Sequence, residues 1–108
     1  MQFTYKAYEK VIILLTEAGY QMTDYHEYNH MKYPCIIRHD VDFSSEKAAR
    51  FAKWEKQLFE KIKGYKGIYF VLVTSDFYNI FSKKGRDLLK QIIENGHEIG
   101  LYFKGKIM

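Results

Sequence analysis

The sequence predicts an α/β protein with about three parallel strands and three helices. Two observations carry this prediction. Stretches with apolar residues three and four apart alternate with short apolar stretches, and that order is typical of βαβ units around a parallel sheet. The run Ile68–Val73 is apolar throughout, as in a strand that is covered on both faces. With 108 residues the chain suits one domain.

Three helices are expected, near Tyr5–Ala18, Ser45–Ile62 and Lys83–Asn95. Each follows a hydroxyl residue that can accept a hydrogen bond from the first turn, and each is followed by a glycine that can end it. The expected N-caps are Thr4, either Ser44 or Ser45, and Ser82, and the glycines are Gly19, Gly64 and Gly96.

Three strands are expected, near Ile36–His39, Gly67–Val73 and Glu98–Leu101. The residues from Tyr20 to Tyr33 are predicted to form a polar, aromatic connection. Three strands make a thin sheet, and the sequence stops soon after the third one. We therefore expect residues 1–108 to be a single incomplete domain, the N-terminal part of a larger α/β unit.

Composition narrows the classes of function. The net charge is +4, and glutamates interrupt the densest lysines, between Lys53 and Lys66. This pattern indicates a solvated helix face, with Glu55 and Glu60 on it, rather than a surface for nucleic acid. The one cysteine, Cys35, excludes an intrachain disulfide and is interpreted as a small buried hydrophobic residue. No signal peptide or membrane span is recognised, so a cytoplasmic location is expected.

The strongest local signal is Arg38-His39-Asp40-Val41-Asp42, where the first strand meets a loop. Alternation along a strand points Asp40 and Asp42 the same way and His39 the opposite way. Two carboxylates at one strand end need a cation, a proton or an arginine between them. A divalent metal is one solution. The alternative is that Asp40 pairs with Arg38 or a lysine while Asp42 caps the second helix, and the spacing favours neither.

The second signal is Asn95-Gly96-His97-Glu98-Ile99-Gly100. Gly100 suits a close approach to the backbone, and His97 is interpreted as a hydrogen-bonded structural histidine. His26 and His30 lie in the polar connection and are interpreted as surface residues.

These two motifs, in this order around a helix and an apolar strand, resemble the polysaccharide deacetylase superfamily, also called the nodulation-deacetylase homology domain. The subgroup that it resembles carries HDVD and GHEIG elements, here 39–42 and 96–100. The resemblance implies a deformed (β/α) barrel with fewer strands than eight. It also implies hydrolysis of acyl groups from amino sugars, assisted by zinc or a similar divalent metal.

The resemblance implies Asp40 as the catalytic base and Asp42 as a metal ligand, with the reverse assignment open. His39, His97 and Tyr102 are candidates to support the site or contact substrate. The sequence departs from the family where two metal histidines are usual, because Tyr102 and Lys106 stand there. We therefore expect weak or no zinc binding by this chain alone.

Three functions follow as hypotheses. The favoured one is a truncated or degenerate deacetylase-like protein that is inactive alone, for which a missing C-terminal half would be a partner. The second is an active metal-dependent carbohydrate deacetylase acting on a carbohydrate substrate. The third is a small α/β ligand-binding module. None of the three involves nucleic acid or a membrane.

Overall fold

The computed structural model describes residues 5–42, 44–103 and 106–107. Its helices are α1 (Tyr5–Glu17), α2 (Ser45–Phe59) and α3 (Lys83–Glu94), together with a short 3-10 helix, η1 (Tyr28–His30). Its strands are β1 (Gln21–Thr23), β2 (Pro34–Val41), β3 (Gly67–Leu72), β4 (Glu98–Phe103) and β5 (Lys106–Ile107). Within the described ranges, no helix is long and apolar enough to cross a membrane.

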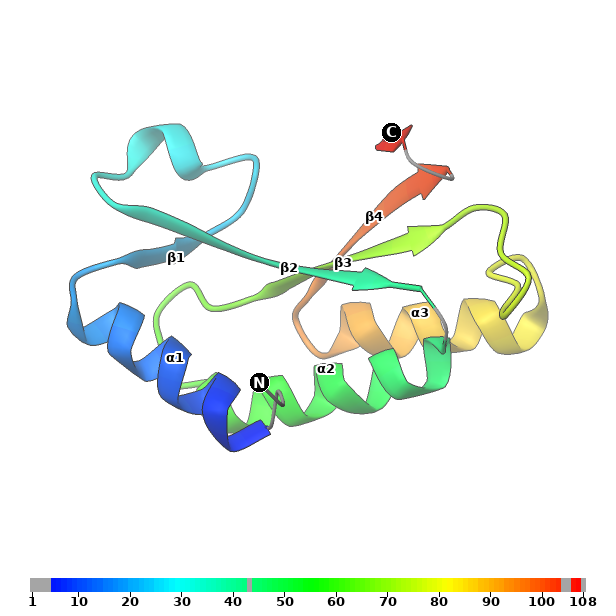
Figure 1. Cartoon of the computed structure of the whole chain (residues 1–108), viewed down its shortest axis with the longest axis horizontal. Coiled ribbons are helices and arrows are strands. Elements are labelled where there is room, and N and C mark those ends of the chain that lie inside the picture. Colours follow the sequence, from blue (N-terminus) through cyan, green and yellow to red (C-terminus); the bar gives the residue numbers. More distant parts are fainter. Residues whose placement is uncertain (1–4, 43, 104–105, 108) are drawn as a thin grey trace.

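The strands form one sheet in the order of the sequence, β1-β2-β3-β4-β5. Strands β1 to β4 are parallel and curl into part of a barrel, whereas β5 runs antiparallel to β4. The three long helices lie on one face of this sheet, and the β1–β2 connection with η1 lies on the other (Figure 1). The α/β class and the parallel pairing of the three predicted strands are confirmed.

The predicted number of strands, three, was too low. Strand β1 lies inside the stretch predicted to be a polar connection, and β5 follows the last predicted strand. Only three residues make up β1, and two of them, Met22 and Thr23, are buried. Such a short stretch shows too little alternation to be recognised from the sequence.

The helix signals agree well with the structure. The Ser44 hydroxyl accepts a hydrogen bond from the Lys47 amide at 3.1 Å, and the Ser82 hydroxyl accepts one from the Gly85 amide at 2.9 Å. Gly96 has a φ of +85°, a left-handed conformation that glycine adopts without strain. Helix α2 ends at Phe59, three residues before the predicted end. The predicted cap Thr4 lies outside the described residues.

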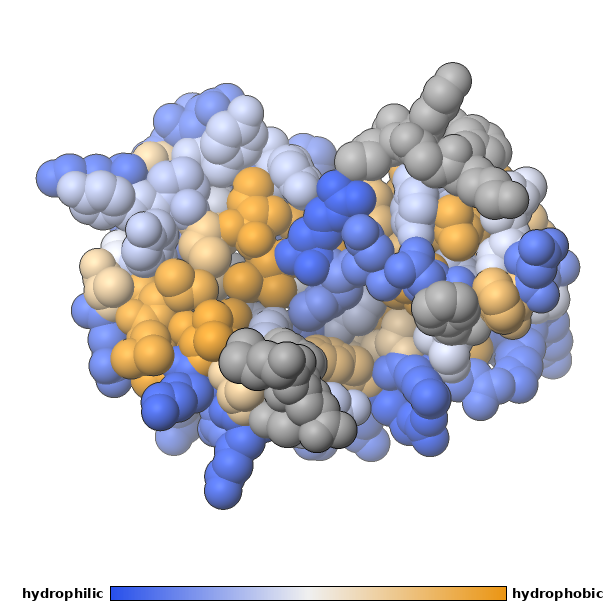
Figure 2. Space-filling model, in the orientation of Figure 1, coloured by the Kyte–Doolittle hydropathy of each residue, from blue (hydrophilic) through white to orange (hydrophobic). Residues whose placement is uncertain are grey.

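Two buried clusters hold the helices to the sheet. One joins α1 to β1 and the end of α2 through Tyr8, Ile12, Met22 and Phe59. The other joins α2 and α3 to the middle strands through residues such as Ala52, Val71 and Ile92. Every residue from Ile68 to Val71 is at most 6% exposed, which confirms that β3 is covered on both faces. Several apolar residues of α1 are exposed, among them Val11 and Leu14. Figure 2 shows an apolar area over that helix.

Candidate functional site

The carboxyl end of β2 carries an ion pair on the face away from the long helices. Arg38 Nε donates a hydrogen bond to Asp40 Oδ1 at 2.8 Å. The Arg38 guanidinium also lies 4.2 Å from the centre of the Phe70 ring, a cation–π contact. Of the two arrangements that the sequence left open for Asp40, the structure has the pairing with Arg38.

Asp42 follows β2 directly and is bound by a tyrosine from β4. The Tyr102 hydroxyl donates a hydrogen bond to Asp42 Oδ1 at 2.7 Å. Partial burial and then this hydrogen bond raise the pKa of Tyr102, so its hydroxyl keeps its proton at neutral pH. Asp42, the last residue of the first motif, and Tyr102, two residues after the second motif, therefore meet at the carboxyl ends of β2 and β4, as in other open parallel sheets. Asp42 does not cap α2, because Ser44 does.

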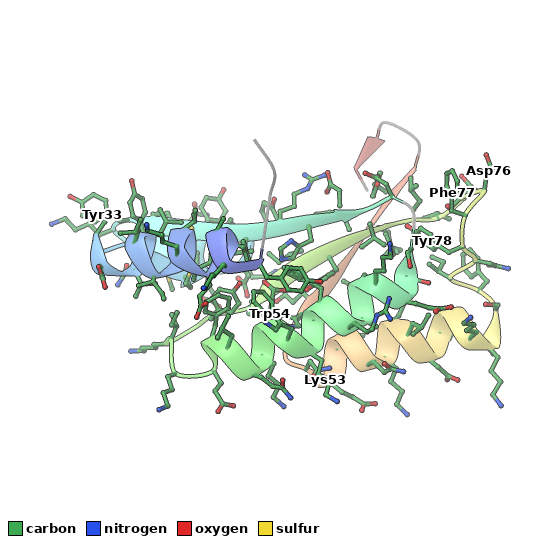
Figure 3. All side chains as sticks on the ribbon, turned by 60° about the horizontal axis from the view of Figure 1, so that its bottom comes forward. Tyr33, Lys53, Trp54, Asp76, Phe77 and Tyr78 are labelled. Atoms are coloured by element: carbon green, nitrogen blue, oxygen red, sulfur yellow. The ribbon has the colours of Figure 1, made fainter. Side chains whose placement is uncertain are left out.

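The loop after β3 forms the rest of this crevice. The Tyr78 hydroxyl donates to the Val41 carbonyl and accepts from the Leu72 amide at 2.8 Å, so it bridges the ends of β2 and β3. A cavity of about 560 Å³ lies beside it. Asp76, Phe77 and Tyr78 follow one another on this loop (Figure 3). The polar residues that line the cavity are Asp42, Thr74, Ser75, Asp76 and Asn79.

The donor groups in this crevice do not fit a catalytic zinc site, which takes about three protein ligands and a water. Asp40 is held by Arg38, and Asp42 is held by Tyr102. Among the side chains that the structure describes, no group of three or more His, Cys, Asp or Glu could hold a metal ion. The side chain of Lys106 lies outside that set.

His39 points to the opposite face of β2, as alternation predicts, and contacts a buried acid. Its Nε2 lies 3.0 Å from Glu55 Oε2. Glu55 is fully buried in α2 and also accepts hydrogen bonds from the hydroxyls of Tyr8, Tyr65 and Tyr69. The prediction that Glu55 lies on a solvated helix face is wrong.

Burial acts to raise the pKa of Glu55, but the hydrogen bonds, first that from His39, outweigh it and leave the pKa below its usual value. The carboxylate is therefore ionised. Burial and the charge of Glu55 raise the pKa of the three tyrosines, which remain hydrogen-bond donors. The sequence did hold a signal for this position, because Glu55 is three residues after Ala52 and four before Phe59, on the inner face of α2.

His97 is a structural histidine, as predicted. Its Nδ1 accepts a hydrogen bond from the Gly67 amide at 2.8 Å, and its Nε2 lies 2.8 Å from the Ala52 carbonyl oxygen. Because a carbonyl only accepts, the proton is on Nε2. His97 precedes β4, at the amino end of the strand, and Asp42 lies beyond the carboxyl end of β2. The structure thus brings Tyr102 to Asp42 and leaves His39 and His97 on the helix face.

Comparison of the chain with models of protein families, with curated proteins and with solved structures found no match.

Proposed function

We propose that this chain is a degenerate polysaccharide deacetylase-like protein that does not by itself remove acyl groups from amino sugars. The resemblance of the two motifs supports the family, and the curled parallel sheet suits its deformed barrel. The observation that best supports the proposed loss of activity is the hydrogen bond from Tyr102 to Asp42.

Tyr102 stands two residues after Gly100, where the family resemblance implies a metal histidine. A protonated hydroxyl there offers a cation no strong donor, and it engages the carboxylate oxygen that a metal would need. This hydrogen bond is exposed to solvent, so its net contribution is about 1 kcal/mol or less. A metal ion at Asp42 would have to compete with that bond.

Asp40 is likewise engaged by a neighbour. Its Oδ1 accepts a hydrogen bond from Arg38 Nε at 2.8 Å. A catalytic base must lie within hydrogen-bond reach of the proton that it takes, so a substrate would have to displace Arg38 from this oxygen. Both aspartates are therefore satisfied by neighbours within the chain.

A ligand-binding role is the second candidate, and the cavity beside Asp42 favours it. Its polar side chains can hydrogen-bond to sugar hydroxyls, and Phe77 at its rim is 65% exposed. An aromatic ring beside a few polar groups is a common way to hold a small ligand. In this role the chain binds a carbohydrate without hydrolysing it.

Calorimetric titration with zinc tests the degenerate site. We expect weak or no binding by the natural chain and no release of acetate from acetylated amino sugars in the presence of zinc. Tyr102→Phe frees Asp42 without adding a ligand. Tyr102→His also frees Asp42 and adds an imidazole ligand. The Tyr102→His variant should therefore bind zinc at least about tenfold more tightly than the Tyr102→Phe variant, a gain of about 1.4 kcal/mol or more.

A one-to-one zinc complex of sub-micromolar affinity in the natural chain, lost in Asp42→Ala, would refute the degenerate site. Zinc-dependent release of acetate would favour the active deacetylase instead. Saturable binding of an acetylated amino sugar without hydrolysis, weakened in Phe77→Ala, would favour the ligand-binding role.

A further inference from the structure

Strand β2 has an open edge along its carboxyl half. Strand β1 pairs with it only as far as Thr23, which lies opposite Ile36. Within residues 5–42, 44–103 and 106–107, no strand pairs with 37–41 on that side, and β3 pairs with them on the other. Figure 1 shows β1 beside only the first part of β2. An edge of this kind is a ready template for another strand.

The orientation of the backbone at this edge follows from Tyr78. Its hydroxyl sits between the Val41 carbonyl and the Leu72 amide, so the Val41 carbonyl points toward β3. The peptide groups of successive residues in a strand point alternately to its two edges. The N–H and C=O groups of Arg38 and Asp40 therefore point to the open edge.

Space lies beside this edge. A cavity of about 380 Å³ is lined by the four consecutive residues His39, Asp40, Val41 and Asp42. Successive side chains of a strand point to opposite faces, so a cavity that touches four in a row lies along the edge. Its other wall includes Tyr5 and Phe51.

We infer that this edge is an interface that pairs, antiparallel, with the same edge of a second copy of the chain. A two-fold axis at His39 places Arg38 of one copy opposite Asp40 of the other, twice. Ile37 of each copy then lies opposite Val41 of the other. The two Arg38–Asp40 positions become hydrogen-bonded pairs, in which each residue both donates to and accepts from its opposite.

Charge selects the second copy and this register. Opposite charges placed directly across a strand pair stabilise the pairing, and like charges placed there destabilise it. A shift by two residues one way places Arg38 opposite Arg38, and a shift the other way places Asp40 opposite Asp40. Only the register centred on His39 pairs every charge with its opposite. Both side chains are partly exposed on the same face, at 32% for Arg38 and 49% for Asp40.

Sedimentation velocity of the purified chain over a wide range of concentrations tests the inference. We expect a monomer–dimer equilibrium. Arg38→Asp alone, or Asp40→Arg alone, places like charges across both pairs. Either change should weaken dimerisation by about tenfold or more, which corresponds to about 1.4 kcal/mol or more. The double variant Arg38→Asp/Asp40→Arg restores opposite charges and should dimerise as the natural chain does.

Lys90→Asp is the matched control, since it makes the same change of charge at an exposed position of α3 and should leave dimerisation unchanged. Asp40→Pro is the second variant, should a reversed charge disturb folding. The N–H of residue 40 points out of the sheet, so the monomer can accept a proline there. The dimer uses that N–H for a hydrogen bond between the copies, so Asp40→Pro should abolish the dimer. Circular dichroism verifies that each variant is folded.

A natural chain that stays monomeric at every concentration would overturn the inference. So would a dimer that survives the single charge reversals, or one that the double variant fails to restore. A monomer that instead binds an extended peptide along β2 would show that the edge serves a different partner. None of these outcomes depends on zinc or on a sugar, so the proposed function is judged separately.

Discussion

At the residue scale, His97 uses both ring nitrogens inside the core, and this makes it sensitive to substitution. It is 5% exposed, and it links the Gly67 amide at the start of β3 to the Ala52 carbonyl in α2. No small side chain can satisfy both groups. His97 therefore contributes to stability by joining a strand to a helix, and it is not an exposed catalytic histidine.

His97→Ala should lower the free energy of unfolding by about 2–4 kcal/mol, because it leaves two buried backbone groups without partners. Chemical denaturation measures this, and His26→Ala, at an exposed position, is the control with an expected change within about 0.5 kcal/mol. Burial lowers the pKa of His97 below its ordinary 6.5.

The unfolded chain therefore takes up a proton at His97 before the folded one does, so its stabilisation is full above pH 6.5 and falls as the pH drops below that. The difference in stability between the natural chain and His97→Ala should shrink over the same range. A difference that stays constant would contradict the assigned neutral tautomer.

Glu55, like His97, is a buried polar residue whose contribution to stability comes from its hydrogen bonds. Glu55→Ala removes a buried acceptor from three tyrosine hydroxyls and from His39 and should cost about 3–5 kcal/mol, as for other broken buried ionic networks. Glu60→Ala, at an exposed position just after the end of α2, is the control. Thermal and urea unfolding measure both. Equal stability of the two variants would mean that the hydrogen-bonded cluster contributes nothing.

At the scale of the element, glycine and tyrosine set how the strands meet. A Cβ atom on Gly100 of β4 would lie 2.5 Å from the Phe70 ring of β3. The close approach predicted for Gly100 is confirmed, and the approaching group is an aromatic side chain. Tyr78 acts at the other end of the same strands, where its hydroxyl bridges β2 and β3.

Tyr78→Phe tests this bridge. Loss of the hydroxyl leaves the Val41 carbonyl and the Leu72 amide without their partner and should destabilise the chain by about 1–3 kcal/mol. Hydrogen exchange at the Leu72 amide should become faster than at amides in the middle of β3. Tyr28→Phe, an exposed tyrosine of η1, should change neither quantity. Unchanged protection of Leu72 would argue against the bridge.

At the scale of the whole molecule, the sequence predicted the features that repeat along the chain. Hydroxyl caps, glycine stops and apolar spacing located all three long helices, and an apolar run located β3. The meeting of Tyr102 and Asp42 was also predictable, because parallel strands bring their carboxyl ends to one edge.

The features that escaped prediction depend on single contacts between distant segments. Strand β1 is too short to show a pattern, and its pairing with β2 defines it. The burial of Glu55 depends on tyrosines from α1, from the residues before β3 and from β3 itself. The choice of Arg38 as the partner of Asp40 depends on side-chain conformation, which the sequence pattern does not specify.

The sequential strand order has a consequence for how fast the protein can fold. Each parallel strand from β2 to β4 lies beside the strand that precedes it in the chain, so each pairing closes one connection and no later strand is inserted between two earlier ones. A shorter separation along the sequence lowers the entropy cost of closing a connection and is associated with faster folding. We therefore expect this sheet to form faster than a parallel sheet of the same size whose strands are not in sequence order.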